Sequence, residues 1–247
     1  MKDEAVISTT DLVAKYGEQT ILEGVSVDFL HNKVNVVLGG SGCGKTTLMR
    51  NILRLEQPFS GSVRFWGEEV TDMDEKEFNR ILKRVGVLFQ NGALMNSISV
   101  FENISIPLEQ HTRVAPALIE RIVRTKLSLV GLDHAIHLLP SELSGGMKKR
   151  AALARAIVLD PDLLICDEPS AGLDPETSAH LDELILDLKH KLNMTMIIVT
   201  HELASIHRIA DRLIFLDSGK LLFQGTLAEA KSSNIEQIDR FFSVGKF

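Results

Sequence analysis

The sequence predicts an α/β fold built on a parallel sheet, and three short apolar runs carry this prediction. They cover residues 34–38, 163–166 and 195–200, are rich in Val, Ile and Leu, and show little alternation with polar residues. Strands that are buried on both faces of a parallel sheet read in this way. Because the carboxyl ends of such strands meet where α/β proteins bind ligands, the residues that follow each run are the candidate site.

The first run opens into a glycine-rich turn that fits the pattern G-x-x-x-x-G-K-[ST] at Gly39, Gly44, Lys45 and Thr46. Glycine lets the backbone curve closely round a polyphosphate with its N–H groups turned inward, and a helix that starts near Lys45 directs its positive end at the same anion. We expect Lys45 to bridge the β- and γ-phosphates and the Thr46 hydroxyl to bind Mg²⁺. Apolar residues at helical spacing support the helix: Leu48, Ile52 and Leu55.

Polar side chains follow the other two runs. Asp167 and Glu168 come directly after residues 163–166, where Asp167 is expected to hold Mg²⁺ and Glu168 to polarise an attacking water. The structural alternative is a carboxylate pair that leads into a surface loop. His201 follows residues 195–200, where it either contacts the γ-phosphate or serves a structural role.

Two further residues are candidates for the same site. Gln90 ends the short apolar run 85–89 and is placed either to reach the metal or the attacking water, or to cap the strand in solvent. Tyr16 is the only tyrosine and lies in a predicted turn. Its ring either stacks on a purine base or is an exposed turn residue, and the spacing leaves both readings open.

Composition excludes several classes of protein. The 247 residues suffice for one large domain or two small ones, and the 45% hydrophobic and 24% charged content is ordinary for a globular protein. A net charge of -6 gives no electrostatic footprint for nucleic acid. No apolar run approaches the roughly 20 residues that span a bilayer, and residues 1–4 lack the apolar core of a signal peptide, so we expect a cytoplasmic protein with Cys43 and Cys166 as thiols.

The remaining segments fill out the α/β prediction. Residues 5–37 alternate apolar segments with polar turns, which predicts antiparallel strands, and residues 61–70 and 213–223 resemble hairpins. Residues 91–159 are predicted to be helical, with a capping box that starts at Ser99. Two apolar faces are expected there: Leu118, Ile122 and Leu129, and Ile119, Val123 and Val130. Four prolines, Pro107, Pro116, Pro140 and Pro161, are consistent with an inserted helical subdomain.

Two more helices are predicted towards the carboxyl end. Asp174 as N-cap and Pro175 at the first helical position begin one of them, with Leu181, Leu184, Ile185 and Leu188 on one face. Residues 234–242 form a short amphipathic helix that is expected to pack on the domain, with a contact between subunits as the alternative.

One segment, residues 143–150, has no role in a self-contained ATPase. Ser144, Gly145 and Gly146 precede a predicted helix and form a second N-terminus suited to an anion, with Ser144 as its N-cap. Three cations follow in the first turns: Lys148, Lys149 and Arg150. The helix dipole disfavours them there, and a nearby phosphate would offset that effect.

This segment resembles the signature motif of the ATP-binding cassette (ABC) ATPases, and the resemblance then extends over nearly the whole chain. It implies a P-loop NTPase with a RecA-like core, an antiparallel β subdomain and an inserted helical subdomain. Tyr16 matches the adenine-stacking aromatic of that family, Gln90 its Q-loop, Asp167 with Glu168 its Walker B pair, residues 170–174 its D-loop, and His201 its switch histidine. Its Walker A loop covers Gly39, Gly40, Ser41, Gly42, Cys43, Gly44, Lys45, Thr46 and Thr47.

The resemblance implies an ATPase that works as a homodimer with ATP and Mg²⁺. Glu168, His201, Lys45 and Gln90 would take catalytic roles, and Thr46, Gln90 and Asp167 would hold the metal. ATP bound to the Walker A loop of one subunit would be capped by Ser144, Gly145, Gly146 and Asp174 of the other. Closure of the dimer would move an attached membrane permease through the Q-loop region.

A narrower branch is also indicated. The family's usual glutamine after Ser-Gly-Gly is Met147 here, and residues 151–156, 89–94 and 100–103 resemble the ATPases of MCE-type (Mla-like) lipid transporters. This implies phospholipid transport between membranes, in the maintenance of outer-membrane lipid asymmetry. The expected partners are a permease, an MCE lipid-binding protein and, as an optional component, a small cytoplasmic regulatory subunit, all at the cytoplasmic face of the inner membrane.

Two alternatives share the core motifs. One is the ATPase of an amino-acid or other nutrient importer, and the other is a regulatory subunit that binds ATP without turnover. Lys45, Glu168 and His201 are all present, which argues against the second. The expected organisation is a single nucleotide-binding domain, with a core at about 1–91 and 160–230, a helical subdomain at about 92–159 and a short C-terminal helix at about 231–247.

Overall fold

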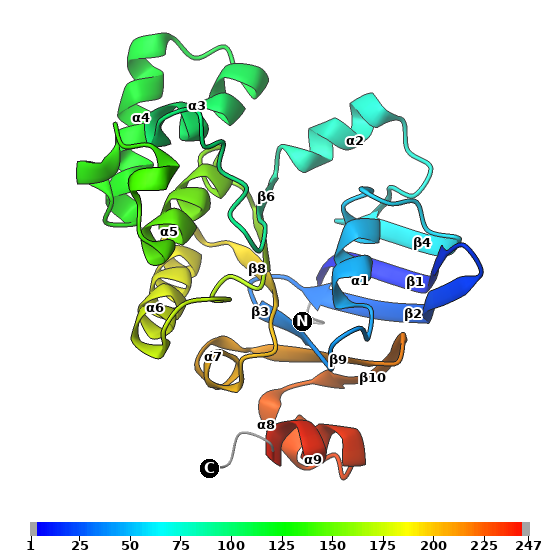
Figure 1. The fold of residues 1–247 in the computed structure, drawn as a ribbon. Helices are drawn as coiled ribbons and strands as arrows, with labels where there is room; N and C mark the ends of the chain where they lie inside the picture. Colours follow the sequence, from blue (N-terminus) through cyan, green and yellow to red (C-terminus); the bar gives the residue numbers. More distant parts are fainter. Residues whose placement is uncertain (1–3, 244–247) are drawn as a thin grey trace. The chain divides into compact units, whose positions relative to one another are not determined.

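The computed structural model describes residues 4–243, and Figure 1 shows its helices and strands. Residues 1–3, part of the segment in which a signal peptide was sought, and residues 244–247, part of the predicted C-terminal region, lie outside this range. The chain divides into two units, and each has its own set of contacts. The first unit comprises residues up to 79 and from 195 onward, and the second comprises residues 80–194.

An antiparallel sheet occupies the first part of the first unit. Its strands, in the order β2-β1-β4-β5, are Gln19–Leu30, Ala5–Tyr16, Ser60–Phe65 and Glu68–Glu69. Strands β1 and β2 form a long hairpin, and β4 pairs with the other edge of β1. Phe29 and Phe65 are among its fully buried side chains. The hairpin at residues 61–70 is therefore confirmed, as are the antiparallel strands within residues 5–30. Residues 34–37, also included in that prediction, belong instead to the parallel strand β3.

A second set of strands in this unit carries the glycine-rich turn. It consists of β10 (Lys220–Gly225), β9 (Arg212–Asp217), β3 (Val34–Leu38) and β8 (Thr195–Val199), which are neighbours in this order. Strand β3 pairs in parallel with both β8 and β9, and β9 and β10 form the predicted hairpin. Every residue of β3 and β8 is buried, which explains why both segments lack polar alternation.

Four helices belong to the same unit: α1 (Lys45–Ile52), α7 (Leu203–Ile209), α8 (Leu227–Lys231) and α9 (Glu236–Ser243). Helix α1 follows β3 as predicted, but it ends at Ile52. Leu55, expected to continue the apolar spacing of this helix, lies beyond its end and is 59% exposed, so that part of the prediction is wrong. The Phe241 ring of α9 meets the ring of Phe215 edge-on at 5.4 Å, so the C-terminal helix packs on its own unit as expected.

The second unit combines two parallel strands with helices. Strand β6 (Val85–Leu88) pairs with β7 (Leu163–Asp167), and the main helices are α3 (Val100–His111), α4 (Pro116–Leu129), α5 (Gly145–Ala156) and α6 (Pro175–Leu192). Helix α2 (Glu75–Leu82) leads into β6, and residues 133–135 and 140–142 form short 3₁₀ turns. The helical character predicted for residues 91–159 is thus confirmed for α3, α4 and α5.

Helix starts follow the predicted caps. The Ser99 hydroxyl accepts from the amide of Glu102, whose carboxylate accepts in return from Ser99, so the capping box is present at α3. These hydrogen bonds lower the pKa of Glu102. Of the two apolar faces predicted for α4, the one with Ile119, Val123 and Val130 is buried as expected. On the other face Ile122 and Leu129 are partly buried and Leu118 is 45% exposed, so the prediction is wrong at Leu118.

Within residues 4–243, none of the helices combines the length and the apolar character that crossing a membrane requires.

A buried amide on β3 offers a test of this fold. The Asn35 side chain accepts from the amide of Leu30 at 2.9 Å and donates to the carbonyls of Leu30, Lys33 and Met196 at 3.0, 3.3 and 3.2 Å. We predict that Asn35→Leu lowers the free energy of unfolding by about 2 to 4 kcal/mol, because it leaves several buried backbone groups without partners. Chemical denaturation measures the change, and Thr20→Val, at an exposed position of β2, is the control with little effect. An unchanged midpoint for Asn35→Leu would contradict the assignment.

Candidate functional site

The glycine-rich turn after β3 is shaped by close packing inside the first unit. Gly39 has φ +147°, and a Cβ there would lie 2.1 Å from the carbonyl oxygen of Leu216 on β9 and 2.7 Å from Cys43 Sγ. Gly44, the N-cap of α1, has φ +103°, and its Cβ would lie 2.6 Å from Cδ2 of Leu22. Both fixed glycines of the sequence pattern are therefore required by the fold itself as well as by any ligand.

The other glycines of this turn face open space. A Cβ at Gly40 or Gly42 would meet no other atom within 4 Å. The Lys45 ammonium donates to the carbonyls of Gly39 and Gly40, both at 2.9 Å, so it lies within the curve of the loop. Helix α1 has no side-chain cap at Gly44, which leaves its positive end available to an anion. The chemistry of this loop suits a polyphosphate.

Three other predicted residues of this unit have distinct surroundings. Tyr16 is the last residue of β1 and is 48% exposed, and its hydroxyl donates to Glu56 at 2.5 Å, which fixes one end of an accessible ring. Cys43 is buried, which raises the pKa of its thiol although Lys45 acts in the opposite direction. His201 is exposed and lies two residues beyond β8, which ends at Val199, one residue earlier than predicted.

In the second unit, strand register brings the Q-loop glutamine and the Walker B glutamate to the same edge. Leu88 of β6 lies opposite Cys166 of β7, so Gln90 and Glu168 each come two residues beyond this pair. Glu168 has φ +47°, a left-handed conformation that is uncommon for a residue with a Cβ. Its carbonyl oxygen accepts from the amide of Ala171 at 3.2 Å. The chain therefore turns sharply at this carboxylate.

Lys149 on α5 is a functional candidate that sequence reasoning did not single out. It is 7% exposed, and its ammonium donates to the backbone carbonyls of Gln90 and, at 3.3 Å, of Glu168. No signal in the sequence distinguishes it from its neighbours. Lys148, Lys149 and Arg150 each lie three and four residues before fully buried residues within 151–154, so apolar spacing alone does not show which of the three points inward.

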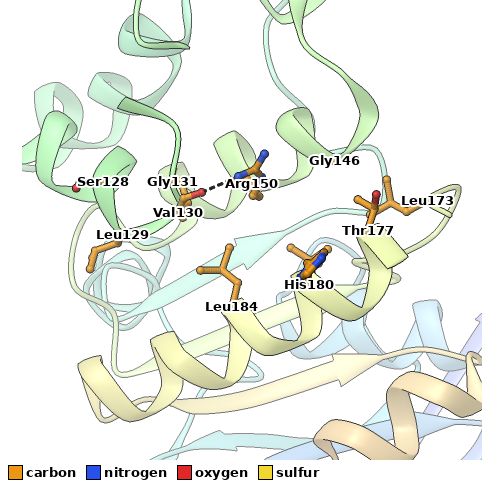
Figure 2. A pocket seen from close by; sticks show the side chains of 11 residues that line it. Ser128, Leu129, Val130, Gly131, Gly146, Arg150, Leu173, Thr177, His180 and Leu184 are labelled. Atoms are coloured by element: carbon orange, nitrogen blue, oxygen red, sulfur yellow. Dashed lines mark hydrogen bonds between the residues drawn. The ribbon is translucent and has the colours of Figure 1, made fainter. Parts of the chain in front are cut away.

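The start of α5 has the predicted cap, and two of the three cations in its first turns donate to backbone carbonyl groups. The Ser144 hydroxyl accepts from the amide of Met147 at 3.2 Å. The sequence suggested that a phosphate offsets the unfavourable placement of cations in the first turns. Two of these cations have backbone carbonyl acceptors, since Lys149 donates as described and Arg150 donates to Val130 at 3.2 Å, the bond drawn in Figure 2.

The start of α6 lies beside the start of α5. Asp174 accepts from the amides of Glu176 and Thr177 at 3.1 and 3.0 Å, which confirms it as the N-cap, and these bonds lower its pKa, with that from Thr177 the larger cause. A Cβ on Gly146 would come 2.7 Å from Thr177 Cγ2. A pocket of about 590 Å³ adjoins this contact (Figure 2); it is bounded by the end of α4, by α5 and by α6, including Leu129, Arg150, Leu173, His180 and Leu184.

The sequence profile of a protein family described as ABC transporter matches residues 22–171, more than half of the chain. The chain belongs to the ABC transporter family. As an ABC ATPase it carries its Walker A loop and His201 in the first unit, and Gln90, the signature turn, Asp167, Glu168 and Asp174 in the second.

Sequence similarity to several known proteins extends over almost the whole chain. The chain is 38% identical over 239 residues to the intermembrane phospholipid transport system ATP-binding protein MlaF of Haemophilus influenzae, covering 97% of this chain and 90% of the relative. It is 38% identical to MlaF of Escherichia coli K12, covering 97% and 89%. It is 37% identical to the probable ribonucleotide transport ATP-binding protein mkl of Mycobacterium tuberculosis, covering 97% and 67%.

Solved structures share the fold of this ABC ATPase. The dimeric post-hydrolysis structure of the ATP-binding cassette MJ0796 with ADP and Pi has a TM-score of 0.81 and 25% identity, covering 90% of this chain and 98% of that chain. The structure of cbiO1 from Clostridium perfringens, part of the ABC transporter complex cbiONQ, has a TM-score of 0.84 and 26% identity, covering 99% and 96%. The predicted P-loop NTPase fold of the ABC type is thereby confirmed.

Two neighbouring glycines of the Walker A loop give a matched test of its packing. We predict that Gly39→Ala lowers the free energy of unfolding by about 3 kcal/mol or more, because its Cβ meets the β9 backbone in a conformation that disfavours side chains. Gly40→Ala should leave stability nearly unchanged, because that position is open. Thermal unfolding of both variants measures the difference, and equal stabilities would contradict the described packing.

Proposed function

We propose that this ABC ATPase powers phospholipid transport between membranes. The observation that carries the proposal is its 38% identity to the MlaF relative over 97% of this chain and 90% of that relative. The mycobacterial mkl relatives have similar identity, but the chain covers only 67% to 69% of their length. The agreement in both length and sequence favours phospholipid transport over the ribonucleotide transport named for those relatives.

The residues suit a division of roles in ATP hydrolysis. The Walker A loop would bind the phosphates, with the Lys45 ammonium on the β- and γ-phosphates and the accessible Tyr16 ring on the adenine. Glu168 would take a proton from the attacking water, while Gln90 and His201 would orient that water and the γ-phosphate. Each of these roles follows from the family motif at that position together with the chemistry of the side chain.

The oxygen donors expected for Mg²⁺ fit that ion. The Thr46 hydroxyl, the Gln90 amide oxygen and the Asp167 carboxylate are all hard oxygen ligands, which Mg²⁺ prefers. Residues 4–243 contain no cluster of three or more His, Cys, Asp or Glu side chains arranged to hold a metal. We propose that these three groups would hold the ion together with ATP phosphate oxygens, and that it would supply positive charge beside the transferred phosphoryl group.

A homodimer is the proposed working form. The solved cassette MJ0796, which shares this fold, is dimeric in two structures. In the proposed dimer, Ser144, Gly145, Gly146 and Asp174 of one subunit would contact the nucleotide held by the other. The capped start of α5 supports this role, because a helix N-terminus with small residues lets a phosphate approach the backbone closely.

The proposed assembly places the dimer on a membrane permease at the cytoplasmic face of the inner membrane. An MCE lipid-binding protein would complete the path of the lipid, and a small cytoplasmic regulatory subunit would join as an optional component. These partners are those implied by the sequence resemblance to MCE-type lipid transporters. The names of the MlaF relatives, which state a role in an intermembrane phospholipid transport system, agree with a transporter complex of this kind.

The base assignment is tested by one substitution. We predict that Glu168→Gln retains ATP binding but lowers turnover by about 100-fold or more, since a positioned general base typically contributes that much. Phosphate release and the binding of a fluorescent ATP analogue are measured side by side. Glu120→Gln, which removes only a surface ion pair with Arg124 on α4, is the control. Normal hydrolysis by the Glu168 variant would show that another group is the base.

The transport assignment is tested by its partners. We predict that affinity purification of the tagged chain from its own membranes in mild detergent recovers a permease and an MCE-domain protein. Mass spectrometry identifies the subunits, and the same purification from untagged cells is the control. Recovery of an importer complex with a solute-binding protein would contradict the lipid assignment while leaving the ATPase assignment intact.

A further inference from the structure

Two loops that carry the proposed reaction meet at one side chain in the second unit. The register of β6 and β7 puts the carbonyl groups of Gln90 and Glu168 at equivalent positions beyond the paired strands. Both groups accept a hydrogen bond from the ammonium of Lys149, in the second turn of α5. No other contact described within residues 80–194 ties both carbonyls to a single donor.

The backbone at Glu168 needs such a restraint. Its φ of +47° places it in the left-handed region, which a residue with a Cβ adopts only when its surroundings hold it there. The Glu168 carbonyl accepts from both the Ala171 amide and the Lys149 ammonium. Because these bonds fix the peptide that follows Glu168, they also fix the direction in which the Glu168 side chain leaves the backbone.

Stability alone is a poor explanation for a buried lysine at this position. Removing an ammonium from water is unfavourable, and an apolar side chain of similar volume commonly packs as well or better. Lys149 is 7% exposed, and two of its hydrogen bonds go to carbonyl groups of loops. The burial of this ammonium is therefore better explained by its effect on structure, because it holds the carbonyl groups of two loops in fixed positions.

Other residues of α5 also contact the Q-loop, but the contacts described for them do not include Glu168. The Arg155 guanidinium donates to the carbonyls of Gly92 and Ala93, both at 2.7 Å, and a Cβ on Gly92 would lie 3.2 Å from the Cβ of Ala152. These contacts fasten residues 92–93 to the helix. Only the Lys149 bonds, among those described, extend the connection from the Q-loop to Glu168.

We propose that Lys149 is a positioning residue for ATP hydrolysis, which holds the Gln90 and Glu168 backbones together so that the Glu168 carboxylate is correctly directed. The inference rests on the proposed role of Glu168 as the base. It also gives α5 two functions, because the same helix begins at the Ser144 turn that is proposed to face the partner's nucleotide. Movement of this helix would therefore reach both loops through one side chain.

The test compares two buried lysines of the same unit. Lys126 is also buried, and its ammonium pairs with Asp160 rather than with the loops. We expect Lys149→Met to lower kcat by on the order of 10- to 100-fold while KM for ATP changes less than about 3-fold, as for a misdirected catalytic group. Lys126→Met should lower the thermal midpoint to a similar extent and keep kcat within about 2-fold of the unmodified chain.

A double variant separates positioning from general damage. If Lys149 acts through Glu168, then adding Lys149→Met to Glu168→Gln should slow the residual turnover by less than about 2-fold. Independent multiplication of the two losses, an equal fall in kcat for Lys126→Met, or a loss confined to KM would overturn the inference. Wild-type kcat in Lys149→Met together with an inactive Glu168→Gln would overturn it while leaving the base assignment in place. Normal turnover by Glu168→Gln would instead refute the base assignment, and this inference with it.

Discussion

Two backbone carbonyl groups at the ends of strands β6 and β7 are joined by the buried ammonium of Lys149. Parallel strands leave such groups beyond their last paired residues, where they need other partners. Here a helix side chain donates to both, and the Glu168 carbonyl also accepts from the Ala171 amide. The position of α5 therefore sets the path of the Q-loop and of the turn at Glu168, and through them the arrangement of the polar groups in the second unit.

In the first unit, a loop is likewise held in one shape, but by close packing at two glycines rather than by hydrogen bonds to a cation. At Gly39 the loop passes so close to β9 that no side chain fits, and at Gly44 the start of α1 lies against Leu22. The open face of the loop at Gly40 and Gly42 is thus a consequence of tight packing on its other face. A phosphate-binding loop of this kind is held in shape by the fold before any ligand binds.

Local signals in the sequence predicted much of this structure. The buried runs at β3, β7 and β8, the caps at Ser99, Ser144 and Asp174, and the hairpin of β9 and β10 were all predicted, because each depends on a few neighbouring residues. Leu55 and Leu118 were misplaced because apolar spacing does not show where a helix ends or which face finds a partner.

For the candidate site, too, the sequence predicted some features and not others. Gln90 and Glu168 were recognised from their places at strand ends, but their equivalent positions depend on a register that only the paired strands reveal. Lys149 was counted among cations facing a ligand because the helix dipole argument concerns charge along the axis and says nothing of direction around it. Its inward direction is shown by its hydrogen bonds to the carbonyl groups of Gln90 and Glu168, a tertiary effect.

The most direct measurement of the central claim is amide hydrogen exchange, followed by mass spectrometry, in the unmodified chain and in Lys149→Met. If one ammonium holds both loops, exchange should become faster in residues 89–93 and in residues 168–173 together, while the peptides of β6 and β7 remain protected. Faster exchange in only one of these segments, or a uniform increase throughout residues 80–194, would contradict the account.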